Sequence, residues 1–276
     1  MLSVNTNSGA MIALQYLNKT ENDLQTTQTH INTGLKVATA KDDGATFAIA
    51  QNMRGNVSGY HAVSDSLNRG VSTVDVALSA GASISDLLNE LKSKALAAAD
   101  ASLDTASRNA LNADFTALRD QITAIVQNAN FNGTNLVDGS VSTITALASA
   151  DGSKKITVAG VTLKLSGAIV TIKTTSTIST QVKASAMIST INASVQNVNA
   201  ALAKLAAGSK KFTIQNDFVS KLVDTLNAGI GNLVDADMAV ESARLQSLQV
   251  KQQLGVQALS IANSQPQIIL SLFRGG

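Results

Sequence analysis

The chain has 276 residues, of which 45% are hydrophobic, 3% aromatic and 14% charged, with a formal net charge of +2 and neither cysteine nor tryptophan. The lack of cysteine excludes disulfides, thiol nucleophiles and cysteine metal sites. The weak charge argues against nucleic acid as a partner, because that binding needs clustered Lys and Arg. The core is expected to be aliphatic, which favours packed helices over large ligand cavities.

The first predicted element is an amphipathic helix with a seven-residue apolar repeat. Leu17, Leu24 and Ile31 recur every seven residues, and Leu14 and Leu35 lie on the neighbouring row. This repeat makes a narrow seam that a single helix cannot bury in water. The helix therefore needs a partner helix.

Two further helices are predicted before the middle of the chain. Residues 41–44 carry two acids and a glycine, which predicts a turn. A second seven-residue repeat then predicts a long helix through Tyr60, Leu67, Val74, Gly81, Leu88 and Ala95. Apolar residues spaced by threes and fours from Leu111 to Val126 predict another amphipathic helix that ends near Asn128.

A small β-rich region is predicted at about residues 131–180. Asn132-Gly133 and Asp138-Gly139 favour tight turns. Apolar residues alternate with Thr, Lys and Gly between residues 156 and 172, which predicts short half-buried strands around Gly160 and Gly167. A helix then returns at residues 187–202, is expected to break near Gly208, and resumes at residues 218–230.

Hydroxyl side chains are dense at the end of this region. If they face solvent they are candidate acceptors of O-linked sugars. The candidate residues are Thr171, Thr174, Thr175, Ser176, Thr177, Ser179 and Thr180.

The last predicted helix has an apolar repeat that matches the first. Its main row is Leu233, Val240, Ser247, Leu254, Ile261 and Ile268, and its second row is Ala236, Ala243 and Val250. The first acidic residue of the chain is Glu21 and the last is Glu241, while seven glutamines lie between residues 246 and 267. Amides are buried against other chains at a lower cost than ions. Both ends therefore favour burial by neighbours, although an ordinary intramolecular coiled coil has the same pattern.

We accordingly predict that apolar residues of both end helices form a core between subunits. The predicted residues are Leu14, Leu17, Leu24, Ile31, Leu35, Leu233, Val240, Val250, Leu254, Ile261 and Ile268.

No residue pattern predicts a catalytic, cofactor or metal site. His30 and His61 stand alone, without another ligand at metal spacing. The carboxylates of Asp42-Asp43, Asp235 and Asp237 lie near helix starts, where capping of backbone amides is their expected role. The glycines do not match a phosphate-binding fingerprint. An enzyme is therefore the least favoured class.

Longer sequence signatures stand near both ends of the chain: residues 33–37 read TGLKV and 40–45 read AKDDGA, while 235–241 read DADMAVE and 262–267 read ANSQPQ. The first two resemble the N-terminal signature, and the last two the C-terminal segment, of bacterial flagellin, the subunit of the flagellar filament. The resemblance covers roughly residues 1–136 and 181–276. The family often ends in a Leu-Leu-Arg run, whereas Phe273 precedes Arg274 here.

The pairing of the two ends predicts a mainly α fold, an elongated rod of long antiparallel helices with a small β-rich tip. A terminal coiled-coil domain (residues 1–42 plus 233–276) lines the filament core, and a helical domain (residues 43–232) carries the β-hairpin region. This matches the short, two-domain form of the family.

The resemblance implies a secreted, extracellular subunit of the flagellar filament, which drives swimming. Its implied partners are copies of itself or related flagellins, the hook-associated junction and cap proteins, a flagellar export chaperone and the type III export apparatus. No cleaved signal peptide is expected, because no positively charged segment precedes an apolar core, and no membrane span is expected, because no run of 18 apolar residues occurs.

Two alternative functions stay open. A hook-filament junction protein shares the export route and resembles flagellin at its ends. An amphipathic membrane-active protein also has apolar stripes, but it should carry Lys, Arg and aromatic residues beside them, and this chain has few of these.

Overall fold

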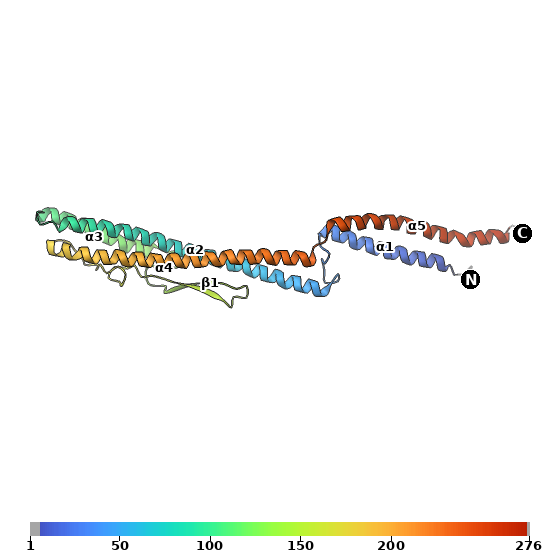
Figure 1. The fold of residues 1–276 in the computed structure, drawn as a ribbon, viewed down its shortest axis with the longest axis horizontal. Coiled ribbons are helices and arrows are strands. Elements are labelled where there is room, and N and C mark those ends of the chain that lie inside the picture. The colour runs from blue at the N-terminus through green and yellow to red at the C-terminus, as the bar shows by residue number, and fades with distance from the viewer. Residues whose placement is uncertain (1–5, 275–276) are drawn as a thin grey trace. The chain divides into compact units, whose positions relative to one another are not determined.

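The computed structural model describes residues 6–274, and the side chains of residues 6–264. Within them the chain is mainly α-helical, as predicted, with one small sheet (Figure 1). The elements in order are α1 (Ser8–Thr33), α2 (Gly44–Ala98), α3 (Thr105–Asn128), β1 (Thr143–Leu147), β2 (Lys155–Ala159), α4 (Gln181–Val234) and α5 (Met238–Arg274).

The chain divides into two compact units. The first unit contains Met1–Gly55 and Thr225–Gly276, and the second contains Asn56–Asp224. Both divisions therefore fall inside helices, since α2 and α4 each contribute residues to both units. The predicted domain boundaries at residues 42/43 and 232/233 lie closer to the chain ends, and the division into a terminal and a helical domain stays a prediction.

Carboxylates and an amide start the helices, as local capping rules require. The side chain of Asn7 accepts a hydrogen bond from the amide of Ala10 and caps α1. Asp43 caps α2, and Asp237 caps α5 through the amides of residues 239 and 240. The predicted capping role is confirmed for these two aspartates, whereas Asp42 accepts from the amides of residues 38 and 39 and closes the turn before α2.

The helices α1 and α5 of the first unit pack antiparallel. Near the start of α1, the Asn7 side chain donates to the carbonyl of Ala262 over 2.7 Å. Further along, Leu17 lies over Gly255, where an added Cβ would approach its Cδ1 to 3.2 Å. At the end of α1, His30 contacts Glu241. The predicted pairing of the two end helices is therefore present within one chain.

The second unit is built on one aliphatic core. Its helices bury side chains at the spacing of the predicted repeats, and the largest fully buried ones include Leu67, Leu88, Phe115, Ile122, Ile191 and Phe212. Where α2 and α4 meet, Gly70 lies against Phe212 and Gly81 against Leu202. These contacts run in opposite directions along the two helices, so α2 and α4 are antiparallel.

The sheet is a two-stranded hairpin. Strands β1 and β2 pair antiparallel, with Thr143 opposite Ala159 and Leu147 opposite Lys155. Only β2 lies in the stretch where strands were predicted. Residues 161–172 form no regular strand, although Leu163, Val170 and Ile172 are buried. The alternating pattern arises because every second side chain is buried. An extended loop can bury side chains in this way without forming the backbone hydrogen bonds of a sheet.

Helix α4 runs without interruption through Gly208, so the predicted break is wrong. A Cβ at Gly208 would lie 2.4 Å from Cγ1 of Val158 in β2. Glycine is used here because the hairpin packs directly on the helix backbone, and a helix tolerates glycine at a cost of roughly 1 kcal/mol.

By length and mean hydropathy α2 also qualifies as a candidate membrane span, although its most apolar window is one-third buried inside the protein. Val63, Leu67 and Val74 of this helix are fully buried in the core of the second unit. A single helix that passes this test of length and hydropathy is weak evidence for a membrane span.

Candidate functional site

The inner face of the α1–α5 pair is a narrow seam with coiled-coil spacing. On α5 the covered residues alternate by fours and threes, and they are Glu241, Leu245, Leu248, Gln252, Gly255, Leu259 and Ala262. On α1 the row predicted from the sequence faces this seam, with Leu17 buried and Leu24 and Ile31 half-buried. Leu17 is thus covered by its own chain.

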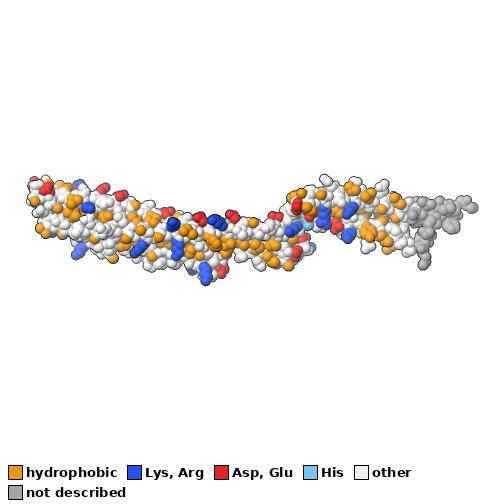
Figure 2. All heavy atoms as spheres, in the orientation of Figure 1, with side chains coloured by type: hydrophobic (Ala, Val, Ile, Leu, Met, Phe, Trp, Pro, Cys, Tyr) orange, Lys and Arg blue, Asp and Glu red, His pale blue; other side chains and the backbone are white. Residues whose placement is uncertain are grey.

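The outer face of the same pair is apolar and exposed. Ten of the fifteen large exposed hydrophobic side chains in the described part of the chain lie on α1 or α5. We call these ten residues the outer patch: Met11, Ile12, Leu14, Tyr16, Met238, Val240, Val250, Leu254, Val256 and Ile261. Figure 2 shows hydrophobic side chains spread over this pair among uncharged ones and a few charged ones. Helix geometry places Val240, Val250, Leu254 and Ile261 on one side of α5, and exposed apolar surfaces of this kind mark sites of association.

The structure places the predicted inter-subunit residues in three surroundings, which are the inner seam, the outer patch and the ends of the helix pair. Leu14, Val240, Val250, Leu254 and Ile261 belong to the outer patch. The predicted row on α5 precedes the covered row by one residue, because Val240, Leu254 and Ile261 come directly before Glu241, Gly255 and Ala262. One residue is a turn of about 100° around a helix, so the predicted row of α5 lies beside the covered row and stays exposed.

The other predicted residues lie at the ends of the pair. Leu35 and Leu233 are half-buried, and Leu35 forms an isolated bridge with Asp235. Ile268 lies outside the residues whose side chains the structure describes.

A backbone clasp joins the segment that follows α1 to the segment that leads into α5. The amides of Lys36 and Val37 donate to the carbonyl of Val234, and the amide of Ala236 donates to the carbonyl of Gly34. Gly34 has a φ of 71°, in the left-handed region that favours glycine, and it ends α1. The clasp holds the end of α1 beside the start of α5.

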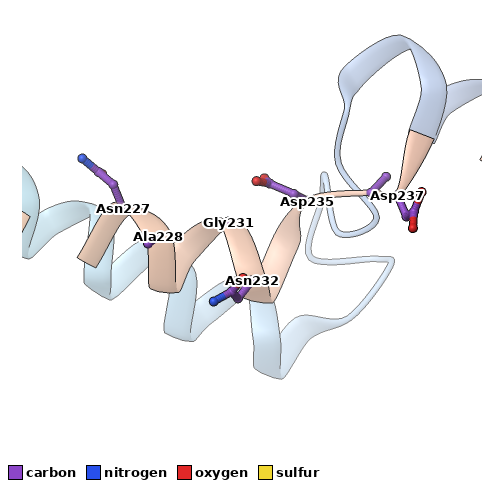
Figure 3. Close-up of a pocket in the computed structure, with 7 residues that line it drawn as sticks. Asn227, Ala228, Gly231, Asn232, Asp235 and Asp237 are labelled. Carbon is purple, nitrogen blue, oxygen red and sulfur yellow. The ribbon is translucent and has the colours of Figure 1, made fainter. Parts of the chain in front are cut away.

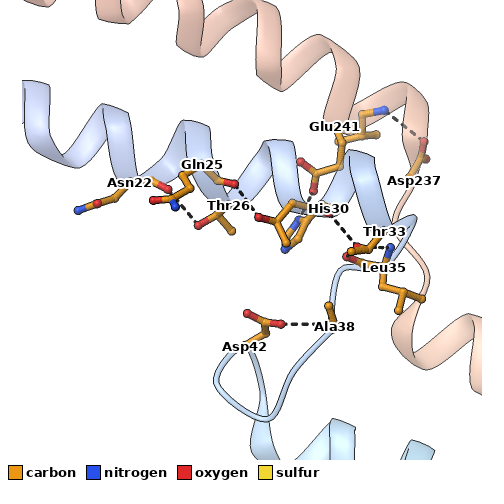
Figure 4. A network of polar contacts seen from close by, with 12 residues as sticks. Asn22, Gln25, Thr26, His30, Thr33, Leu35, Ala38, Asp42, Asp237 and Glu241 are labelled. Atoms are coloured by element: carbon orange, nitrogen blue, oxygen red, sulfur yellow. Dashed lines mark hydrogen bonds and ion pairs between the residues drawn. The ribbon is translucent and has the colours of Figure 1, made fainter.

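A polar layer closes this end of the seam (Figure 4). Nδ1 of His30 lies 3.0 Å from Oε1 of Glu241, and both side chains are nearly buried. Oε2 of Glu241 and Oγ1 of Thr27 have no hydrogen-bond partner among the described residues. The hydrogen bond from the Thr39 amide lowers the pKa of Asp42, and the nearby His30 adds a smaller effect in the same direction. Sequence spacing could not reveal the contact between His30 and Glu241, since these two residues are 211 positions apart.

An open polar hollow lies beside the clasp (Figure 3). It has a volume of about 490 Å³, and its polar lining comes from Asn227, Asn232, Asp235 and Asp237. In Figure 3 the side chains of Asn227 and Asp235 both project above the helix. In the described part of the chain, no three His, Cys, Asp or Glu side chains are grouped as a metal site would require.

The hydroxyl cluster at residues 171–180 belongs to the second unit and packs against its helices. Thr171, Thr174, Thr175 and Thr180 are exposed, and Ser176, Thr177 and Ser179 are half-buried. The buried Arg119 donates to the carbonyl of Ser176 over 2.8 Å. The hydroxyl of Ser176 accepts from the amide of Lys173. Thr174 and Thr175 therefore present the most accessible hydroxyls of the cluster's middle.

Comparison with known proteins places both ends of the chain in one family. Residues 4–142 match the bacterial flagellin N-terminal helical region, and residues 188–273 match the C-terminal helical region. Flagellin FljK of Caulobacter vibrioides is 55% identical, over 99% of this chain and 98% of its own length. A flagellin of Brucella melitensis is 38% identical over the full length of both chains.

A solved structure shows the same fold. It is a protein from Vibrio parahaemolyticus provisionally assigned as flagellar hook-associated, and it is 14% identical, with a TM-score of 0.57 over 70% of this chain and 100% of that one. At this identity the likeness concerns the fold alone. The two family matches and the identity to full-length flagellins show that the chain belongs to the bacterial flagellin family, as a structural subunit of the flagellar filament and not an enzyme.

Proposed function

We propose that the outer patch of the α1–α5 pair is the surface through which copies of this flagellin join in the filament core. The observation that carries the proposal is the exposure of the predicted apolar row of α5, which is offset by one residue from the row that α1 covers. The inner seam is already filled by α1, so the exposed row of Val240, Leu254 and Ile261 has no partner within the described chain. A second copy can supply that partner.

The charge distribution supports burial of this surface. Between Val250 and Ile261 the one charged residue is Lys251, and the remaining polar residues are Gln, Ser or Gly. Burying amides and hydroxyls between chains costs less free energy than burying ions. Contacts between different surfaces on successive copies build a helical filament when the rotation between copies does not close into a ring.

Three further parts of the proposal concern the export route, the partners at the filament ends and glycosylation. We propose that the chain leaves the cell unfolded through the flagellar type III apparatus with an export chaperone, and that hook-associated junction and cap proteins bind the filament ends. The cysteine-free composition supports passage of an unfolded chain, because no disulfide must be reduced. The exposed Thr174 and Thr175 support O-glycosylation, which intact-mass analysis of native filaments tests.

Polymerisation of the purified full chain tests the role of the outer patch. Seeded filaments are expected by negative-stain microscopy for the unmodified chain and to be lost in V250Q/L254Q/I261Q. The matched control is L96Q/V182Q, since both of these side chains are exposed on the second unit, outside the patch. Equal filament yield from the patch variant and the control contradicts the proposal.

A further inference from the structure

A second apolar surface lies on α4 in the second unit. Ile214 is 58% exposed and Phe218 is 56% exposed. They are four residues apart and so share one face of the helix. The chain has only six phenylalanines, and Phe218 is one that lies exposed. Aromatic side chains are frequent anchors of protein interfaces, so an exposed one marks a candidate contact. We call Ile214 and Phe218 the α4 knob.

A shallow groove of about 310 Å³ lies between α2 and α3 of the same unit. Small side chains line it, which lets another chain approach closely. The lining residues used here are Val76, Ser79, Ala80 and Ser83 of α2 and Ala124 and Ile125 of α3. The groove and the knob share no residue, so one copy can offer both at once.

Charges at one end of the two surfaces are complementary, while the exposed Asp217 also lies beside the knob and the exposed Asp75 beside the groove. Lys210 and Lys211 precede the knob on α4, and Asp86 and Glu90 follow the groove on α2. All four are exposed, and none of them forms an ion pair in the described part of the chain. Opposite charges flanking an apolar contact fix its register and orientation.

The spacing of these charges matches the spacing of the apolar groups. The knob is centred on residue 216, five residues after Lys211 on α4. Because α4 runs antiparallel to α2, placing this centre over Ala80 of a parallel copy puts Lys211 beside residue 85 or 86 of that copy. This position holds Asp86. Within one chain, Gly70 lies against Phe212 and Gly81 against Leu202, so Lys211 lies opposite residue 71 or 72 of α2. That position is about 14 residues along α2 from Asp86. At 1.5 Å per residue, this is roughly 20 Å along the helix.

We infer that the α4 knob of one copy docks into the α2–α3 groove of a second, parallel copy, with Lys211 pairing with Asp86. This inference rests on the proposed function and adds a contact outside the α1–α5 pair. Knob and groove are different surfaces, so the contact is heterologous and can be repeated from copy to copy along a filament. Parallel copies joined in this way are staggered by roughly 20 Å along α2.

Disulfide trapping tests the contact, and the cysteine-free chain makes each pair unambiguous. Filaments of D86C/K211C are first verified by microscopy and then oxidised with diamide. A ladder of dimers, trimers and higher multimers is expected on a non-reducing gel. A disulfide needs Cα atoms within about 7 Å, so this pair cannot close inside one chain. Intact filaments with monomers alone, or with nothing beyond dimers, overturn the inference.

The matched control is D75C/S209C. Oγ of Ser209 lies 3.4 Å from Oδ1 of Asp75 in the same chain. Oxidation should therefore close this pair within the chain and leave a monomer band. If the unmodified chain forms no filaments, the proposed function fails before any cross-link is attempted. If D86C/K211C polymerises poorly alone, equal mixing with unmodified chain still places variant copies side by side, and dimers and trimers are then expected.

A charge exchange gives a second readout. K211E and D86K should each raise the critical concentration for assembly about fivefold, and K211E/D86K should restore it to within about twofold. K173E changes the same charge at an exposed position away from the knob and should have little effect. A double variant that is as defective as both single variants combined overturns the pairing.

Discussion

Replacing Leu254 with Gln should strongly weaken filament assembly while leaving the monomer folded. Leu254 is 59% exposed, and fully burying a leucine is worth about 1.5–3 kcal/mol, so the filament gains about 1–2 kcal/mol from the exposed part. Burying an unpartnered amide adds a penalty of about 1–3 kcal/mol. The sum is about 3 kcal/mol, which corresponds to roughly a 100-fold higher critical concentration.

Sedimentation of seeded filaments at graded protein concentrations measures this quantity. Gln and Leu have similar helix propensities, so the circular dichroism of the monomer should not change. The control is V182Q, whose side chain is 78% exposed on α4 of the second unit. A critical concentration for L254Q within about threefold of the control refutes the reasoning, because Leu254 would then stay in water in the filament.

Three further predictions concern stability and titration. Gly208→Ala should lower the free energy of unfolding by about 1–3 kcal/mol, because its Cβ meets Val158, whereas Gly55→Ala, with no atom within 4 Å, should raise it by about 0.5–1 kcal/mol; denaturant unfolding measures both. The Ser149 hydroxyl lowers the pKa of Asp151 to about 2, so this carboxylate stabilises the hairpin turn above its ordinary pKa of 3.8, and that contribution is lost as the pH falls towards 2. Ser149→Ala should bring the pKa of Asp151 back towards 3.8 in an NMR titration, and an unchanged value contradicts the assignment. A double-mutant cycle of His30→Ala and Glu241→Ala should give a coupling of about 1 kcal/mol in thermal unfolding, and additive effects show that their contact adds no stability.

The sequence predicted the helices well because their apolar residues repeat with a clear period. It could not assign the repeats to partners. Leu17 and Leu254 belong to equally regular rows, but one faces the inner seam and the other faces outward. Periodicity states which side of a helix is apolar, and the packing of the second helix decides whether that side is covered by the same chain.

Contacts between distant segments were the other limit of the sequence. Gly208 resembles a helix break until Val158 is placed against it, and His30 stands alone until the fold brings Glu241 beside it. Neither contact has a local signal. The flanking turn residues Asp43 and Asp237, by contrast, were predictable, because a cap depends on the next three residues alone.

The accessibility of one engineered thiol tests the central claim most directly. Ser247 is exposed, lies on the outward row between Val240 and Leu254, and is nearly the same size as cysteine. S247C should react rapidly with a maleimide in the monomer and at least about tenfold more slowly in filaments, while a thiol at the exposed Thr175 should react at similar rates in both. Equal reaction of S247C in monomer and filament would show that the outer patch stays in water, and the assembly role assigned to it would be wrong.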